Sequence, residues 1–250
     1  MAEIELHTAE APKPQLILSE WQGRHNQDLP GQVRRIEQGK TYRDLSTVIV
    51  VPTRGTIPAR AVENWMGLLM PMNQKVARLF ISGMEVGAAY QSAIEFVLAH
   101  PELSKWRYVL TLEEDNLPPP DGLIRLYEHI DEYDALGGLY WTKGEDGQPM
   151  IYGDPKGILN FIPQKPREDE VQECNGLGMG FTLFHLDLFR DEKLPKPWFQ
   201  TLQRWEPTGG TQSYTQDLWF FEQARKVGHR FASDNRVKVG HLDVQTGIVW

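Results

Sequence analysis

The sequence contains four consecutive apolar β-branched residues at positions 48–51, immediately before Pro52. Such a run is typical of a strand that is buried on both faces of a sheet. Further strand patterns follow at 76–81, 107–112 and 135–141, and amphipathic helical patterns lie between them. This alternation predicts a mostly parallel α/β sheet whose crossover helices cover its faces.

Residues that favour helix ends bound the helical patterns. Pro58 and Asp121 stand where two helices are expected to start. Two longer helices are expected at about 85–100, ending before Pro101, and at about 216–227.

Residues 1–44 differ from the rest, because prolines, glycines and scattered charges surround only one short apolar run, at 16–18. We expect these residues to form an N-terminal extension and residues 45–250 to form a single domain. Within that domain the alternating pattern occupies 45–141, and 142–250 forms a looser half with one long helical pattern.

Composition and charge exclude several functional classes. The chain has 26 basic and 34 acidic residues and a formal net charge of −8. Binding that depends mainly on nucleic-acid phosphates is therefore not expected, although one local patch could still meet such a partner. Cys174 is the single cysteine, which rules out an intrachain disulfide framework and a multi-cysteine zinc site. Without a run of about 20 apolar residues or a leader pattern, we expect a cytoplasmic protein with no integral membrane segment.

Polar residues follow three of the predicted strands. Arg54 follows the first strand, residues 82–83 (Ser-Gly) end the second, and three acids, Glu113, Glu114 and Asp115, end the third. Ligands of open α/β sheets bind beyond the carboxyl ends of the strands. In an extended chain Glu113 and Asp115 point to the same side, and two such carboxylates suit a hard divalent ion such as Mg²⁺ or Mn²⁺. From the residues alone, a solvated acidic loop is an equal alternative.

The segment YVLTLEEDNLPPP, residues 108–120, resembles the metal-binding strand end of nucleotide-sugar glycosyltransferases of the GT-A fold, close to the family 2 type. In that family an Asp-x-Asp-like motif ends a strand and proline follows it. Other segments resemble the family in the same order along the chain, at 50–55, 83–94, 137–140, 178–181, 215–217 and 240–241. The resemblance implies a GT-A-like (Rossmann-like) α/β fold with a mostly parallel central sheet flanked by helices. It makes 45–141 the nucleotide- and metal-binding half and 142–250 the acceptor and catalytic-base half.

The resemblance also implies roles for individual residues. It makes Asp217 the general base. The residues implied to contact the donor are Pro52, Thr53, Arg54, Gly55, Ser82 and Glu114. The residues implied to hold a divalent metal ion are Glu113, Asp115 and His241. The residues implied to lie beside the acceptor are Gly178, Met179 and Gly180. Trp141 joins them as an aromatic residue that could stack on a sugar face, with core packing as the alternative.

The sequence departs from the family pattern at four positions. Glu113 stands where the family usually has Asp, and Gln216 replaces an acid that often precedes the base. Tyr90 stands where Arg is common, and Ser82 ends a strand that lacks the usual nucleobase-binding Asp. The last two departures concern the identity of the donor more than the class of reaction.

The expected function is transfer of a sugar from a nucleotide-diphosphate donor to an acceptor hydroxyl, with Mn²⁺ or Mg²⁺ as cofactor and inversion at the anomeric carbon. A saccharide is the first expectation for the acceptor, and the sequence predicts neither the nucleotide nor the oligomeric state. Two alternatives stay open. One is a nucleotidyltransferase that uses the same metal carboxylates without Asp217, and the other is a catalytically silent sugar- or nucleotide-binding module.

Overall fold

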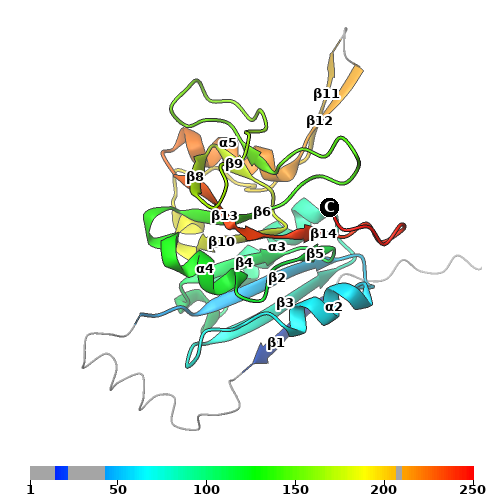
Figure 1. The fold of residues 1–250 in the computed structure, drawn as a ribbon. Coiled ribbons are helices and arrows are strands. Elements are labelled where there is room, and N and C mark those ends of the chain that lie inside the picture. Colours follow the sequence, from blue (N-terminus) through cyan, green and yellow to red (C-terminus); the bar gives the residue numbers. More distant parts are fainter. Residues whose placement is uncertain (1–14, 22–42, 207–209) are drawn as a thin grey trace, which may run out of the picture.

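The computed structural model describes residues 15–21, 43–206 and 210–250. Its centre is an eight-stranded sheet with the strand order β1-β3-β2-β4-β10-β6-β13-β8 (Figure 1). In that order the strands are β1 (Gln15–Trp21), β3 (Val76–Ser82), β2 (Thr47–Thr53), β4 (Tyr108–Leu112), β10 (Phe181–His185), β6 (Ala135–Leu139), β13 (Phe231–Lys238) and β8 (Val171–Cys174).

Five of these strands run in one direction, which confirms the predicted mostly parallel sheet. Strand β2 pairs in parallel with β3 and β4, and β13 pairs in parallel with β6. Strand β10 lies antiparallel between β4 and β6, and the edge strands β1 and β8 are also antiparallel to their neighbours. The alternating pattern of residues 45–141 does not predict this insertion, because β10 arrives from the looser second half without a crossover helix.

Helices cover both faces of the sheet, and the period-two alternation within each strand assigns side chains to the two faces. Val48 and Val50 belong to one core cluster with residues of α3 (Val86–Ala99) and α5 (Gln216–Lys226). Ile49 and Val51 belong to the other cluster with residues of α2 (Ala59–Met66) and α4 (Gly122–His129). The β-branched run is fully buried because it supplies side chains to both cores.

The C-terminal segment returns to the carboxyl end of β4. Strand β14 (Gly240–His241) pairs antiparallel with β5 (Asn116–Leu117), and His241 is opposite Asn116. The backbone N–H of Leu242 also donates to the carbonyl oxygen of Asp115 at 2.8 Å. Residues 113–117 and 240–242, which are far apart in the sequence, therefore share one end of the sheet.

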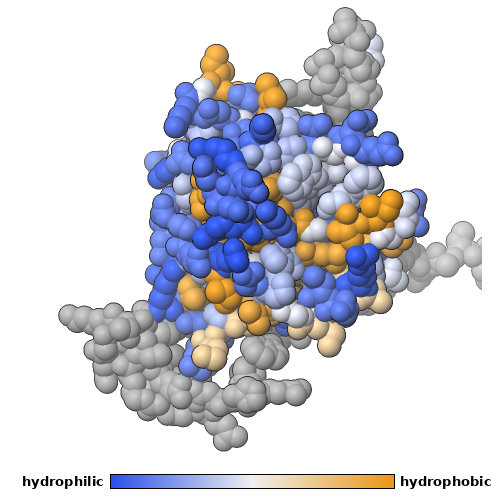
Figure 2. All heavy atoms as spheres, viewed as in Figure 1, coloured by the Kyte–Doolittle hydropathy of each residue, from blue (hydrophilic) through white to orange (hydrophobic). Residues whose placement is uncertain are grey.

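Two smaller strand pairs complete the second half. Strands β7 (Ile151–Tyr152) and β9 (Gly176–Leu177) pair beside α5, and β11 (Leu202–Glu206) and β12 (Gly210–Tyr214) form an arm that projects from the body (Figure 1). On the face seen in Figure 2, hydrophilic residues dominate and an apolar patch lies over the C-terminal segment, where Val244, Ile248 and Val249 are exposed.

The expected N-terminal extension lies mostly outside the described residues, which include only 15–21 and 43–44 of it. Residues 15–21 form β1, a strand that the sequence analysis does not predict, at the edge of the sheet beside β3. In the described part of the chain, every helix is too short or too polar to cross a membrane.

Candidate active site

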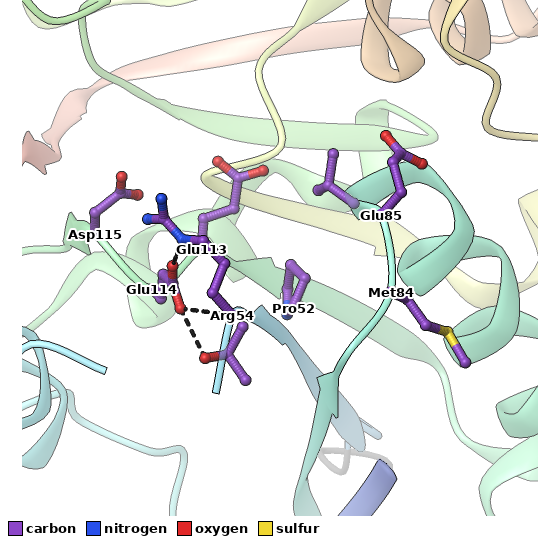
Figure 3. Close-up of a pocket in the computed structure, with 9 residues that line it drawn as sticks. Pro52, Arg54, Met84, Glu85, Glu113, Glu114 and Asp115 are labelled. Carbon is purple, nitrogen blue, oxygen red and sulfur yellow. Dashed lines mark hydrogen bonds and ion pairs between the residues drawn. The ribbon is translucent and has the colours of Figure 1, made fainter. Parts of the chain in front are cut away.

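A cavity of about 390 Å³ opens where β2 and β4 end and α3 begins (Figure 3). It is lined by Pro52, Thr53, Arg54, Met84, Glu85, Val86, Glu113, Glu114 and Asp115. Four of these residues are acidic and one is basic. An anionic ligand would therefore need additional positive charge to bind here.

Glu114 fixes the loop that follows β2. Its carboxylate accepts hydrogen bonds from the Thr53 hydroxyl at 2.7 Å and from the backbone N–H of Arg54 at 3.0 Å. It also forms an ion pair with the Arg54 guanidinium, whose Nε lies 2.5 Å from Glu114 Oε1 (Figure 3). Glu114 is 7% exposed and Arg54 is largely exposed. The structure thus places Glu114 as the anchor of the predicted donor loop, with the Arg54 side chain at its open side.

Glu113 lines the cavity, and its side chain points away from the Glu114 contacts (Figure 3). Its Oε1 accepts a hydrogen bond from the Tyr90 hydroxyl at 3.0 Å. Burial, together with the nearby charge of Asp115, raises the pKa of Glu113 to about 7. Tyr90 is therefore the neutral partner of a carboxyl group that holds a proton more readily than an exposed one.

Asp115 faces two nitrogen-bearing side chains at the end of β4. Lys143 Nζ lies 2.5 Å from Asp115 Oδ2, and His241 Nε2 lies 3.6 Å from the same oxygen. Although burial opposes the effect, His241 and Lys143 lower the pKa of Asp115 to about 2. Asp115 is therefore a carboxylate at neutral pH.

The imidazole of His241 is fixed on its other side. Its Nδ1 lies 2.8 Å from the carbonyl oxygen of Trp141, which can only accept a hydrogen bond, so Nδ1 carries the hydrogen. The ring of Tyr140 packs edge-on against it at 5.6 Å. In the neutral imidazole, the lone pair of Nε2 then faces a carboxylate oxygen. A cation between Nε2 and Asp115 would find a nitrogen and a carboxylate oxygen as ligands there.

Asp217 lies in the first turn of α5 and is 7% exposed. Its Oδ1 accepts hydrogen bonds from the Thr215 hydroxyl and from the backbone N–H of Leu218, the latter at 2.9 Å. Burial raises its pKa. The start of α5 adjoins the start of α3, because Gln216 packs against Gly87. Asp217 is therefore a buried carboxyl group near the cavity wall that contains Glu85 and Val86.

The other predicted site residues lie around this cavity or behind it. Ser82 ends β3 and is not part of the lining, and Gly55 follows Arg54 in the left-handed region, with φ of 107°. Gly178, Met179 and Gly180 are buried. A Cβ atom at Gly178 would lie 2.1 Å from the Tyr140 hydroxyl oxygen, so this glycine is required by close packing.

Several residues of the site were not individually expected from the sequence. Met84, Glu85 and Val86 line the cavity, and the resemblance named only their segment, 83–94, without giving them a role. Lys143 lies 28 positions from its partner Asp115 in a chain with 26 basic residues. A contact of that kind is visible only in the folded chain.

The predicted metal ligands do not form a complete cage. Within the described ranges, no group of three or more His, Cys, Asp or Glu side chains is arranged to hold a metal ion. Asp115 and His241 lie together, whereas Glu113 is engaged by Tyr90. A metal ion at this position would therefore need further ligands from a bound substrate.

Comparison with known proteins identifies the fold. Neither a family model nor a curated protein matches the sequence. Among solved structures, A197 from STIV is 18% identical with a TM-score of 0.56, and the match covers 79% of this chain and 86% of that one.

Two further solved structures are more distant. GalNAc-T7 with UDP, GalNAc and Mn²⁺ is 11% identical, with a TM-score of 0.48 and coverage of 80% of this chain and 44% of that one. TarS 1–349 from S. aureus in complex with UDP-GlcNAc is 15% identical, with a TM-score of 0.42 and coverage of 75% and 55%. The chain thus spans about half the length of these two proteins.

The likeness to A197 extends over most of both chains and is a likeness of fold. The structure confirms the expected α/β fold, a mostly parallel central sheet flanked by helices.

Proposed function

We propose that this protein is a glycosyltransferase that uses a nucleotide-diphosphate sugar and a divalent metal ion. The observation that carries the proposal is the pair formed by His241 and Asp115, the second of which lines an acidic cavity. The His241 Nδ1 hydrogen is directed to the Trp141 carbonyl oxygen, which leaves Nε2 as a ligand opposite the carboxylate. Metal-binding histidines commonly donate their second ring N–H to a backbone carbonyl in this way.

The donor set fits Mn²⁺ better than Mg²⁺, because one of the two ligands is an imidazole nitrogen. Two protein ligands are too few for a closed structural site, but they suit an ion completed by substrate phosphates. Such an ion would neutralise the leaving diphosphate. The acidic lining supports this reading, since Glu85, Glu113 and Glu114 would otherwise repel a diphosphate.

The donor is proposed to lie over the loop of residues 52–55. Glu114 fixes this loop through the Thr53 hydroxyl and the Arg54 backbone. The Arg54 guanidinium is paired with Glu114 but largely exposed, and a bound phosphate or nucleotide would compete with Glu114 for it. Glu114 would thus contribute to donor binding through the loop, with no direct contact to the donor. Gly178 to Gly180 and Trp141 would form the wall on the acceptor side.

Asp217 is proposed to act as general base in an inverting displacement. As the acceptor oxygen forms its bond to the anomeric carbon, Asp217 accepts the hydroxyl proton. The bond between the anomeric carbon and the phosphate oxygen breaks, and the electron pair leaves with the nucleoside diphosphate. Burial raises the pKa of Asp217, which makes the carboxylate a stronger base than one in water. We further propose that residues 45–250 act as one domain, with the donor bound by 45–141 and the acceptor by 142–250.

A panel of nucleotide sugars with Mn²⁺ tests the proposal. We expect slow release of nucleoside diphosphate from one donor, because water replaces the missing acceptor, and loss of that release with chelator or in Asp115→Asn. Release of pyrophosphate from a nucleoside triphosphate and a sugar phosphate would instead identify a nucleotidyltransferase. Donor binding without any turnover would identify a silent binding module. Either of these results would reject the proposed function.

A further inference from the structure

Lys143 occupies the cation position of the proposed metal site. Its Nζ lies 2.5 Å from Asp115 Oδ2, the same oxygen that His241 Nε2 approaches at 3.6 Å. A divalent ion between His241 and Asp115 would therefore meet an ammonium group at the same carboxylate oxygen. Two cations cannot share one oxygen at this distance without strong repulsion.

The backbone at Lys143 is held in a tight turn that follows β6. Thr142 N–H donates to the Gln148 carbonyl oxygen at 2.9 Å, and Gln148 N–H donates to the Thr142 hydroxyl at 2.8 Å. Gly144, with φ of 109°, provides the left-handed residue that the turn requires. The anchor of Lys143 is thus fixed, while its four-carbon side chain is 32% exposed and has room to rotate.

We propose that Lys143 is a built-in competitor of the divalent ion that couples metal binding to donor binding. In the protein without ligands, its ammonium group neutralises Asp115 and weakens binding of a metal ion on its own. When a nucleotide diphosphate is present, the displaced ammonium group gains a phosphate oxygen as a new partner. Metal and nucleotide then bind more tightly together than separately, and the coupling is reciprocal. This inference rests on the proposed function, because it assumes the metal site at Asp115.

Lys143 acts here as a positioning residue, and the test reads metal affinity instead of activity. The dissociation constant of Mn²⁺ is measured on the full chain by electron paramagnetic resonance, with Mn²⁺ alone and with UDP or GDP added. We expect Lys143→Gln to bind Mn²⁺ alone about three- to tenfold more tightly than the wild type, because one competing charge is removed. The tightening of Mn²⁺ binding by the nucleotide should be correspondingly smaller in the variant.

Two control variants separate competition from a general change in charge. Lys156→Gln removes one positive charge from the segment that follows β7 and leaves the pair with Asp115 intact, so its Mn²⁺ affinity should equal that of the wild type. Lys143→Arg keeps the charge and should also remain close to the wild type. Tighter binding in Lys156→Gln of the same size as in Lys143→Gln would overturn the inference.

The outcomes also distinguish this inference from the proposed function. If Mn²⁺ binds, and Asp115→Asn abolishes binding while Lys143→Gln leaves it unchanged or weaker, the metal site stands and the role of Lys143 is refuted. If neither the wild type nor Lys143→Gln binds Mn²⁺ with UDP or GDP present, both this inference and the metal-dependent function are refuted.

Discussion

In the metal-free protein, the free energy of unfolding should decrease as the pH rises, because Glu113 loses its proton. Replacing Glu113 by Gln should abolish this decrease. Glu113 is partly buried, and its carboxyl group accepts a hydrogen bond from the Tyr90 hydroxyl at 3.0 Å. Burial, together with the charge of Asp115, raises its pKa from 4.5 to about 7. Gln has the same shape, and its Oε1 can accept the same hydrogen bond.

The sign and size of the effect follow from proton linkage. Between pH 4.5 and about 7, the folded protein keeps a proton on Glu113 that the unfolded chain has already released. The free energy of unfolding therefore falls as the pH rises through this range. At about 1.4 kcal/mol per pH unit the full loss would be roughly 3.4 kcal/mol. Partial exposure of the carboxyl group reduces the expected loss to about 2–3 kcal/mol.

Urea unfolding at pH 5 to 8.5 in the presence of EDTA measures this loss. From pH 5 to 8, the stability of Glu113→Gln should rise by about 2–3 kcal/mol relative to the wild type. Glu145→Gln, which changes an exposed acid in the same way, should show no such trend. A difference between Glu113→Gln and the wild type that stays constant across the pH range would refute the reasoning.

Two further substitutions test the packing around the site. Glu114→Ala should lower the free energy of unfolding by about 2 kcal/mol and weaken donor binding, because the Thr53 hydroxyl loses its 2.7 Å partner. Urea unfolding measures the first effect and nucleotide titration the second. Unchanged donor affinity would contradict the role of the loop. Gly178→Ala should destabilise the protein by about 1–3 kcal/mol, because the added Cβ would lie 2.1 Å from the hydroxyl oxygen of Tyr140. Gly157→Ala is the matched control, since its nearest contact would be at 3.7 Å. Equal melting temperatures for the two glycine variants would contradict the predicted clash.

The sheet was predictable where local signals and burial agree. The run at 48–51 is buried on both faces and forms β2, and the helix expected at about 85–100 is α3, Val86–Ala99. The position of β10 was not predictable, because its antiparallel pairing with β4 and β6 is a long-range contact without a periodic signature. The strand formed by residues 15–21 was not predictable for the same reason. Its short apolar run is too weak a local signal, and the strand depends on its long-range pairing with β3.

The positions of the acidic residues of the site were predictable from the sequence, whereas the side chains that contact them were less so. The strand-end position of Glu113 and Asp115 follows from the alternation of strands and helices, and both line the cavity. His241 was expected as a metal ligand only because of the family resemblance, and no residue spacing predicted it. The pairing of β14 with β5 brings it to Asp115. Lys143 lies outside any motif, because its role depends on where a turn of the folded chain places one flexible side chain.

The most direct test of the account is the separation of donor binding from turnover in Asp217→Asn. The amide Oδ1 can still accept hydrogen bonds from the Thr215 hydroxyl and the Leu218 N–H, so the fold and the metal-dependent affinity for the donor should stay within about twofold of the wild type. Release of nucleoside diphosphate, measured with the same donor and Mn²⁺, should fall about 10²- to 10⁴-fold. Turnover within about tenfold of the wild type at unchanged donor affinity would contradict the assignment of Asp217 as the general base.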